Sequence, residues 1–351
     1  MSKVIVGLSG GVDSAVAAYL LKVAGYDVIG VTLKNWESKT GEPGRCCEIT
    51  EAQRIAAALD ISYFVKNAFD SFREYVTEPF VREYACGRTP NPCVECNRYV
   101  KWDEMMQAAQ HMGANYIATG HYATVTRLAN GRYTVKQADH AEKDQTYMLY
   151  RLTQEQLAHT IMPLGKLSKT EVRKIAKEVG IPVANKPDSQ EICFVPEGNY
   201  ADFVEEEAGE FPAGNFVDED GNILGKHKGI IHYTVGQRKG LGIAMGHPVF
   251  VKKIDAKKNE VVLSEEGALF SDTVVVNRLN FLGIEDIKEG EKIRARARIR
   301  YHHSGEWATL TRSGAETVTI TFDSPVRAAS PGQSAVFYDE DNCLLGGGII
   351  V

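Results

Sequence analysis

A short glycine- and serine-rich segment near the amino terminus constrains this chain more than any other feature. Ser9-Gly10-Gly11-Val12-Asp13-Ser14 joins an apolar run, which predicts a buried strand over residues 3–8, to an amphipathic stretch, which predicts a helix over 13–24. Glycines permit a sharp turn that points backbone N–H groups at an anion, and the helix N-terminus adds a partial positive charge. The segment therefore predicts a phosphate-binding loop, the alternative being a tight strand-to-helix turn.

The residues of this loop exclude two common types of phosphate-binding loop. No Gly-Lys-Ser/Thr follows it, as a Walker A loop requires, and its glycines do not have the Gly-x-Gly-x-x-Gly spacing. Asp13 carries a negative charge that a neighbouring phosphate would repel unless a cation lay between them. We therefore expect Asp13 to hold a Mg²⁺ ion that bridges the phosphates.

The alternation of strand and helix patterns predicts the fold class. Up to about residue 182, short β-branched runs alternate with amphipathic stretches, which indicates an α/β fold with a parallel sheet. The later residues have glycine-rich turns between short alternating runs, a pattern typical of small β-rich domains. We expect three domains, at residues 1–200, 201–271 and 272–351. Within the first, strands are expected at 27–33, 62–66 and 115–119, helices at 50–59, 70–85 and 97–111, and a further helix after the capping box Ser168-Lys-Thr-Glu171.

Charge and hydropathy exclude several classes of protein. The 351 residues include 40 basic and 46 acidic side chains, a net charge of −6, which argues against a generally basic nucleic-acid coat. No apolar run approaches the roughly 18 residues of a membrane span. We expect a cytoplasmic protein with no membrane partner, in which any RNA site is local.

The cysteines are candidates for chemistry. Seven are scattered along the chain, and in a cytosolic protein this favours catalysis or metal binding over structural disulfides. Cys96 is predicted to lie just before a helix and near Arg98 and Lys101, which favours a reactive thiolate. Cys93 and Cys96 form a Cys-x-x-Cys pair, which also suits half a zinc site, a redox pair or two buried small side chains. The adjacent Cys46 and Cys47 are interpreted as structural or incidental.

A run of alternating basic residues predicts a charged strand face. Across Lys292–Arg300 every second residue is basic, so five positive charges would share one face, about 7 Å apart, opposite a core of Ile and Ala. Such a stripe on an acidic protein suits an RNA backbone. The alternative is a solvated face that pairs with Glu289, Glu291 or Glu306.

Taken together, these motifs resemble a known family. The loop at 9–14 is similar to the PP-loop, SGGxDS, of ATP pyrophosphatases. With Asn91-Pro-Cys-Val-Glu-Cys96, the segment around Cys193 and Gly229–Gly240, the whole chain resembles the tRNA-uridine 2-sulfurtransferases. This resemblance implies ATP-dependent 2-thiolation of the wobble uridine of tRNA, with a sulfur-donor protein as partner and a β-barrel as the last domain.

The resemblance also implies roles for individual residues. Cys96 would be the nucleophile and Cys193 the persulfide carrier, with a transient disulfide between them. ATP would bind Gly7, Leu8, Ser9, Gly10, Gly11, Val12, Asp13, Ser14, Gly120 and, beside the adenine, Leu33. Asn91, Pro92 and Cys93 would line the target base, and tRNA would contact His121, Lys143, Asp144, Gln145, Arg300, Tyr301 and Gln333.

One residue departs from a common form of the family, and three alternatives stay open. Cys93 stands where that form has Asp, so Cys93, Cys96 and Cys193 are also candidates to hold three irons of a [4Fe–4S] cluster. A second alternative is another PP-loop enzyme that adenylates a small carboxylate or amide. A third is a non-catalytic RNA-binding protein whose cysteines hold a structural metal.

Overall fold

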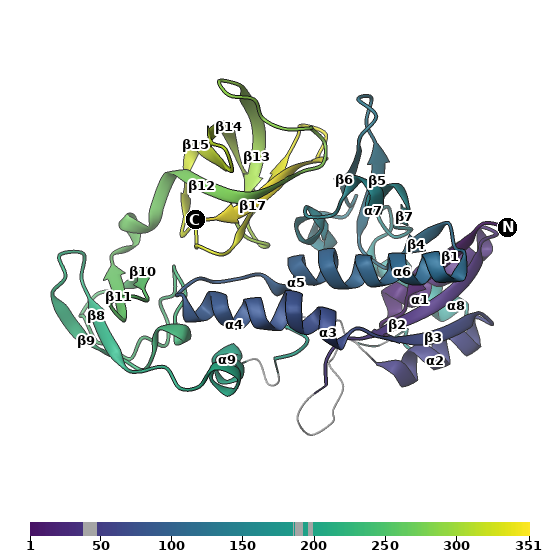
Figure 1. The fold of residues 1–351 in the computed structure, drawn as a ribbon, viewed down its shortest axis with the longest axis horizontal. Coiled ribbons are helices and arrows are strands. Elements are labelled where there is room, and N and C mark those ends of the chain that lie inside the picture. Colours follow the sequence, from purple (N-terminus) through teal and green to yellow (C-terminus); the bar gives the residue numbers. More distant parts are fainter. Residues whose placement is uncertain (38–47, 185, 187–191, 196–198) are drawn as a thin grey trace.

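The first part of the chain is built on a parallel sheet. The computed structural model describes residues 1–37, 48–184, 186, 192–195 and 199–351. Five strands run parallel in the order β3-β2-β1-β4-β7 (Figure 1). They are β1 (Lys3–Gly7), β2 (Asp27–Lys34), β3 (Ser62–Asn67), β4 (Tyr116–Ala118) and β7 (Thr160–Ile161). The α/β prediction is confirmed, and the strand order reverses direction between β1 and β4.

Apolar residues alternate across this sheet into two cores. Val4 and Val6 of β1 pack with helices α1 (Val12–Val23), α2 (Ile49–Ala58) and α8 (Lys169–Glu178) on one face. Ile5 packs into the second core, which includes Met105 on the opposite face. Because both faces of β1 are covered, it is a continuous run of apolar residues.

Two long helical segments extend from the sheet. Consecutive helices α3 (Phe69–Phe72), η1 (Arg73–Thr77) and α4 (Glu78–Ala85) form the first. The second consists of α5 (Pro92–Glu95), η2 (Cys96–Trp102) and α6 (Asp103–Met112). In each, the middle segment is π-helical, a wider turn that often occurs at functional sites.

A hairpin and short helices complete the first region. Strands β5 (Ala123–Arg127) and β6 (Tyr133–Gln137) pair antiparallel, and η3 (Ala141–Lys143), η4 (Thr146–Leu149) and α7 (Gln154–Ala158) follow. The predicted capping box is confirmed at the start of α8, where Ser168 and Glu171 bond reciprocally. It sets the first residue of α8 at Lys169.

The second region is a small mixed sheet next to a helix. Its strands lie in the order β10-β11-β8-β9. Its elements are α9 (Tyr200–Ala208), β8 (Gly214–Val217), β9 (Ile223–His227), η6 (Ile230–His232), β10 (Phe250–Asp255), β11 (Glu260–Ser264) and η7 (Glu266–Leu269).

The third region is a closed six-stranded barrel, as expected. Its strand order is β12-β15-β14-β13-β16-β17. The strands are β12 (Phe270–Phe281), β13 (Lys292–Arg298), β14 (Glu306–Gly314), β15 (Thr317–Arg327), β16 (Ser334–Tyr338) and β17 (Leu344–Ile350). Ala295 and Ala297 of β13 are fully buried in the barrel core, which confirms the period of two.

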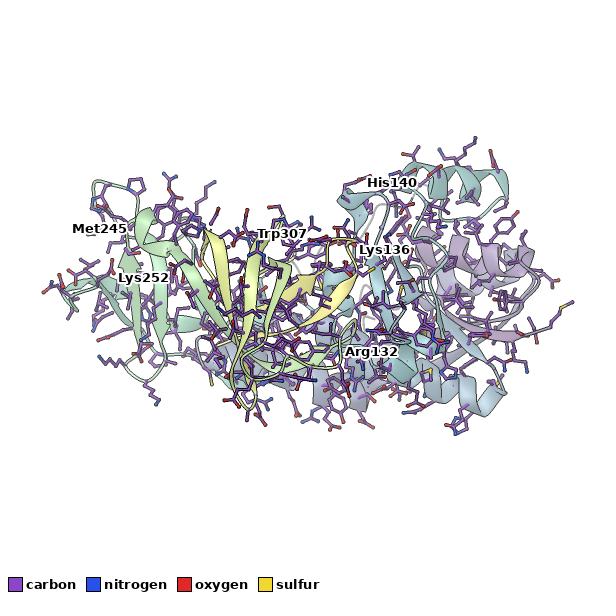
Figure 2. All side chains as sticks on the ribbon, turned by 90° about the horizontal axis from the view of Figure 1, so that it is seen from above. Arg132, Lys136, His140, Met245, Lys252 and Trp307 are labelled. Carbon is purple, nitrogen blue, oxygen red and sulfur yellow. The ribbon has the colours of Figure 1, made fainter. Side chains whose placement is uncertain are left out.

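Buried hydrogen bonds attach the barrel to the first region. The Tyr147 hydroxyl donates to the Ser334 carbonyl at 2.8 Å, and the Thr134 hydroxyl donates to the Leu344 carbonyl. Arg132 lies where the β5–β6 hairpin meets the barrel (Figure 2) and donates to the carbonyls of Phe281 and Leu282. The barrel is therefore a fixed part of the structure around the site. Among the residues described, no helix is long and apolar enough to cross a membrane.

Candidate active site

The glycine-rich loop lies at the carboxyl end of β1, as expected. Gly10 has φ +79°, and a Cβ there would come within 2.8 Å of Glu48, so the turn requires glycine. Ser14 donates from its hydroxyl to the Gly11 carbonyl and accepts from the Ser9 N–H. Gly11 is the N-cap of α1 and has no side chain with which to cap it, so the first N–H groups of the helix face the loop.

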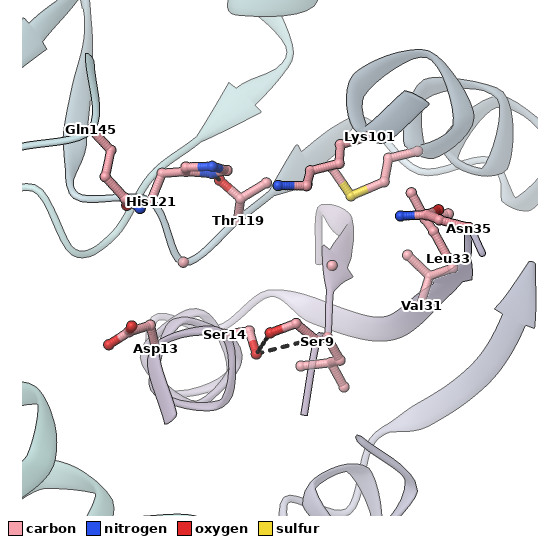
Figure 3. Close-up of a pocket in the computed structure, with 14 residues that line it drawn as sticks. Ser9, Asp13, Ser14, Val31, Leu33, Asn35, Lys101, Thr119, His121 and Gln145 are labelled. Atoms are coloured by element: carbon pink, nitrogen blue, oxygen red, sulfur yellow. Dashed lines mark hydrogen bonds between the residues drawn. The ribbon is translucent and has the colours of Figure 1, made fainter. Parts of the chain in front are cut away.

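A pocket of about 230 Å³ lies over this loop (Figure 3). It is at the sheet's carboxyl edge between β1 and β4, where the strand order reverses and ligands of open α/β sheets bind. It is lined by Gly7, Leu8, Ser9, Asp13, Ser14, Val31, Leu33, Asn35, Lys101, Met105, Thr119, Gly120, His121 and Gln145. Seven of the ten residues predicted to bind ATP are among them, the others being Gly10, Gly11 and Val12.

Sequence reasoning missed several polar residues of this site, among them Asn35, Lys101 and Lys169. Asn35 is buried one residue past β2, at the sheet edge where ligands of open α/β sheets bind, so its place after a predicted strand is a signal that could have found it. Lys101 reaches the pocket from η2. Lys169 comes from a distant helix, and no local pattern marks it.

Gly120 holds the far side of the pocket close to the loop. A Cβ at this position would lie 2.7 Å from the Asp13 carbonyl carbon and the Ser14 nitrogen. The segment after β4 therefore touches the first turn of α1, and only a residue without a side chain permits that approach.

A positive charge lies beside the Asp13 carboxylate. The Lys169 ammonium is 2.8 Å from both carboxylate oxygens, and the Tyr122 hydroxyl donates to one of them at 2.7 Å. Carboxylate oxygens are the atoms that Mg²⁺ prefers. Asp13 therefore fits the predicted Mg²⁺ by chemistry, and a metal ion there would compete with Lys169 for the same oxygens.

His121 faces the same pocket as a neutral ring. Its Nδ1 is 2.9 Å from the Thr119 hydroxyl, and its ring lies 5.4 Å from that of Trp102. Burial, and to a lesser degree the positive charge of Lys101, lowers the pKa of His121 to about 3. At pH 7 it therefore acts as a hydrogen-bonding group without a charge.

The helix around Cys96 differs from the prediction. Asn91 is the N-cap, its side chain accepting from the Cys93 N–H at 3.2 Å, and Pro92 occupies the first helical position. Helix continues without interruption into η2, so Cys96 lies in the second turn and not before the first. The dipole effect falls off within the first turn, so it acts at Cys93.

The cysteines differ in exposure. Cys96 is buried in the second core, Cys193 is half-buried against the same core, and Cys93 is exposed. Across the described parts of the chain, no three His, Cys, Asp or Glu side chains are gathered so as to hold a metal ion. Cys93, Cys96 and Cys193 thus do not fit a shared cluster here. Cys46, Cys47 and residues 189–191 beside Cys193 lie outside the described residues.

The segment 143–145 connects the barrel to the pocket. Asp144 is buried, and its carboxylate accepts from Arg298 and from the Thr146 hydroxyl, each at 2.9 Å. Gln145 accepts from the Tyr122 N–H at 2.9 Å and lines the pocket. Lys143 is half-buried at the end of η3. The Asp144 side chain is thus enclosed within the protein.

The arginine strand face is not the open basic stripe that was expected. Arg294 pairs with Asp323, Arg296 donates to Gln137 and Asn342, and Arg298 binds Asp144. Arg300 lies past the end of β13 and donates to the Arg327 carbonyl. The acidic partners are Asp323 and Asp144 and not the neighbouring glutamates, because sequence neighbours do not reveal which strands and loops pack together.

Two further predicted RNA residues bond within the protein. The Tyr301 hydroxyl donates to the Asp144 carbonyl at 3.3 Å. Gln333 of the barrel donates from Nε2 to the Thr89 carbonyl at 2.8 Å, and the Thr89 N–H donates to Pro331 at 2.8 Å. The barrel therefore holds the loop that leads to Asn91 and Cys93.

Comparison with known proteins places the chain in a family. The profile of the tRNA methyl transferase HUP domain matches residues 2–197, that of the tRNA methyl transferase PRC-barrel domain 201–265, and that of the aminomethyltransferase beta-barrel domain 271–350. A tRNA-specific 2-thiouridylase from Lachnoclostridium phytofermentans is 52% identical, and the alignment covers all of both chains. This chain belongs to the tRNA-specific 2-thiouridylase family.

Other relatives carry the same name. The tRNA-specific 2-thiouridylases of Clostridium acetobutylicum and Clostridioides difficile are 47% and 48% identical over 99% of this chain, covering 99% and 98% of their own. Among solved structures, the U34-tRNA thiolase NcsA from Methanococcus maripaludis with its [4Fe–4S] cluster aligns with 59% of this chain and 66% of its own, at 19% identity and a TM-score of 0.37.

Proposed function

We propose that this protein catalyses the ATP-dependent 2-thiolation of the wobble uridine of tRNA. Membership of the 2-thiouridylase family over the full chain carries this proposal. The pocket supports it, because a glycine-rich loop, a helix N-terminus and an apolar wall at Val31 and Leu33 suit a nucleoside triphosphate. The enzyme is a sulfurtransferase.

The first chemical step activates a poor leaving group. The uridine 2-oxygen attacks the α-phosphate of ATP, the bond to the bridging oxygen breaks, and pyrophosphate leaves with the electron pair. Loop N–H groups and the α1 N-terminus stabilise the negative charge that develops on the phosphates. Asp13 would hold Mg²⁺, which neutralises phosphate charge when it is bound.

The second step transfers sulfur. A persulfide on Cys193 attacks C2 of the adenylated base and AMP leaves. The Cys96 thiolate then attacks Sγ of Cys193, which breaks the persulfide S–S bond, forms a Cys96–Cys193 disulfide and leaves the thiocarbonyl on the base. The sulfane sulfur gains the two electrons that the cysteines lose, so an external reductant must restore both thiols. A sulfur-donor protein would load Cys193.

The RNA is proposed to enter between the barrel and the first region. Asn91, Pro92 and Cys93 would line the flipped base, and the exposed position of Cys93 supports this. The residues proposed to lie at the tRNA contact remain His121, Lys143, Asp144, Gln145, Arg300, Tyr301 and Gln333. The side chains of Asp144, Tyr301 and Gln333 form hydrogen bonds within the protein. We therefore propose that these three residues shape the site and do not contact tRNA through their side chains.

The five-stranded sheet, the four-stranded sheet and the barrel support domains at residues 1–200, 201–271 and 272–351. We propose that the protein works in the cytoplasm. The β12 strand begins at Phe270, close to the last proposed boundary. Removal of residues 272–351 would take away the carbonyls to which Tyr147 and Thr134 donate and would expose these two side chains, so we expect the first domain to require the barrel.

Thiolation of unmodified tRNA tests the function. Protein with ATP, Mg²⁺, a persulfide donor and a reductant should form 2-thiouridine, measured by mass spectrometry of digested tRNA. Cys96→Ser should form none while still releasing pyrophosphate with tRNA. Cys86→Ser is the control, because Cys86 is an exposed cysteine at the end of α4, ten residues before Cys96. Pyrophosphate release that is indifferent to tRNA would instead favour a small-molecule substrate.

A further inference from the structure

The Cys-x-x-Cys pair at Cys93 and Cys96 is used only in part by the proposed reaction. Cys96 is buried, 6% exposed, whereas Cys93, three residues earlier, is exposed. The proposed sulfur transfer ends with a disulfide between Cys96 and Cys193, and Cys193 is half-buried. One sulfur of that disulfide is therefore shielded from a bulky reductant and the other is partly shielded, while an exposed thiol lies one helical turn away.

The first turn of the helix holds the two cysteines of the pair close together. The Cys96 N–H donates to the carbonyls of both Cys93 and Pro92, which gives a tight turn in which residues three apart lie nearly above one another. The Cβ atoms of such residues are about 5–6 Å apart in a helix, and a disulfide needs about 3.5–4.5 Å. An approach of roughly 1 Å, with rotation of the Cys93 side chain about χ1, brings the two sulfurs to bonding distance.

The neighbouring contacts determine which of the two cysteines moves. Asn97, next to Cys96, is buried and donates from Nδ2 to the Met148 carbonyl at 3.0 Å, so the backbone at Cys96 is held within the protein. At Cys93 the Asn91 side chain accepts from the backbone N–H, and the thiol stays at the surface. The exposed Cys93 side chain can therefore turn toward a Cys96 that is fixed in place.

We propose that Cys93 is a third catalytic cysteine, which resolves the Cys96–Cys193 disulfide. This inference rests on the proposed function. The Cys93 thiol loses its proton to water and attacks Sγ of Cys96. The Cys93–Cys96 bond forms, the Cys96–Cys193 bond breaks, and its electron pair leaves on Cys193, which takes up a proton. One disulfide replaces another, so the exchange itself needs no reductant. Cys193 can then accept the next sulfur, and an external dithiol reductant can attack the exposed sulfur of Cys93.

Mapping of the disulfides tests the exchange directly. The full-length protein would be equilibrated in a glutathione redox buffer, quenched with acid, blocked with N-ethylmaleimide and digested with trypsin. Trypsin cleaves after Arg88 and Arg98, so a Cys93–Cys96 disulfide stays within one peptide and a Cys96–Cys193 disulfide joins two. Mass spectrometry of the wild type should find mainly the internal disulfide, and Cys93→Ser should give the joined peptides. Joined peptides as the main product of the wild type would overturn the proposal.

The mapping uses no ATP, tRNA or sulfur donor. Failure of the thiolation proposal would therefore appear separately, as wild-type protein that forms no 2-thiouridine.

Two reductants separate the exchange from the proposed lining of the base site by Cys93. Multiple-turnover formation of 2-thiouridine would be measured with limiting thioredoxin, a bulky dithiol protein, and with a limiting small phosphine, which reaches half-buried sulfurs. Cys93→Ser should slow the thioredoxin-dependent rate roughly tenfold more than the phosphine-dependent rate, because only the larger reductant needs an exposed sulfur. A change in the base site alone would slow both rates equally, and equal slowing would contradict the exchange.

The control for both measurements is Cys86→Ser. Cys86 is also exposed but lies at the end of α4, so this variant should keep the disulfide pattern of the wild type and its ratio of the two rates. Thermal unfolding checks that each variant folds. If Cys93→Ser forms no 2-thiouridine with either reductant, the disulfide found in the wild type decides between the two outcomes.

Discussion

The loop at residues 9–14 and the basic strand β13 both have a regular sequence pattern. The structure agrees with the role predicted for the loop and differs from the open basic face predicted for the strand. The loop is where it was expected, at the end of β1, and it lines the pocket. In β13 the alternation was right but the use of the charges was not, since Arg296 and Arg298 bond within the protein. A loop that works through its own backbone can be recognised locally. The partner of a charge depends on tertiary packing.

The difference continues within β13 itself. Arg298 is a buried cation, 12% exposed, on a carboxylate that is 3% exposed. Arg294, four residues earlier on the same strand, pairs with Asp323 in the open, with both side chains more than half exposed. The same residue type therefore forms a buried pair that joins two regions and a surface pair that joins two strands.

The largest expected effect is on the buried pair. Arg298→Met would leave the Asp144 carboxylate buried without its cation, which costs about 3–5 kcal/mol when one member of such a pair is removed. Urea unfolding at pH 7 would measure the free energy. We also expect the segment up to Gln145 to loosen, which would raise the KM for ATP.

The double variant Asp144→Asn/Arg298→Met tests whether the loss of stability in Arg298→Met comes from the unpaired Asp144 carboxylate. It removes the buried charge while keeping hydrogen bonds to Thr146, so it should recover part of the lost free energy. A single Arg298→Met variant as stable as the wild type would show that the barrel interface does not depend on this pair.

A smaller effect is expected at the pocket. Gly120→Ala places a methyl group 2.7 Å from backbone atoms of Asp13 and Ser14, and overpacking of this kind costs about 1–3 kcal/mol. The strain falls on the loop, so the KM for ATP should rise more than stability alone explains. Gly267→Ala is the control, because no atom lies within 4 Å of its added methyl group. Equal ATP affinity in both variants would contradict the close approach at Gly120.

Features formed by residues close together in the sequence could be predicted, and features formed by residues far apart could not. The loop, the parallel sheet and the Ser168 capping box rest on local patterns and were all found. The helix start at Pro92 was missed, although Asn91 and Pro92 are residues typical of an N-cap and a first helical position. Lys169 lies 156 residues from Asp13, and only helix packing brings the two together.

The ring of His121 gives a pH-dependent test of the pocket. With a folded-state pKa of about 3 and an ordinary value of 6.5, only the unfolded chain takes up this proton between those values. The free energy of unfolding should therefore fall as pH drops below 6.5, by up to about 1.4 kcal/mol per pH unit from this residue. Urea unfolding of the wild type and His121→Gln at pH 7.5, 6.0 and 5.0 measures it. Parallel curves for the two proteins would show that the ring is not buried as described.

The smallest expected effect completes the comparison along β13. Arg294→Met removes the exposed partner of Asp323, and surface pairs of this kind contribute little to stability because water and salt screen them. The cost should shrink further in high salt, because exposed charges are screened. The substitution is the same as at Arg298, on the same strand, so the two unfolding free energies differ only through burial and partner. If Arg294→Met destabilised the protein as much as Arg298→Met, burial would not be what distinguishes the two arginines.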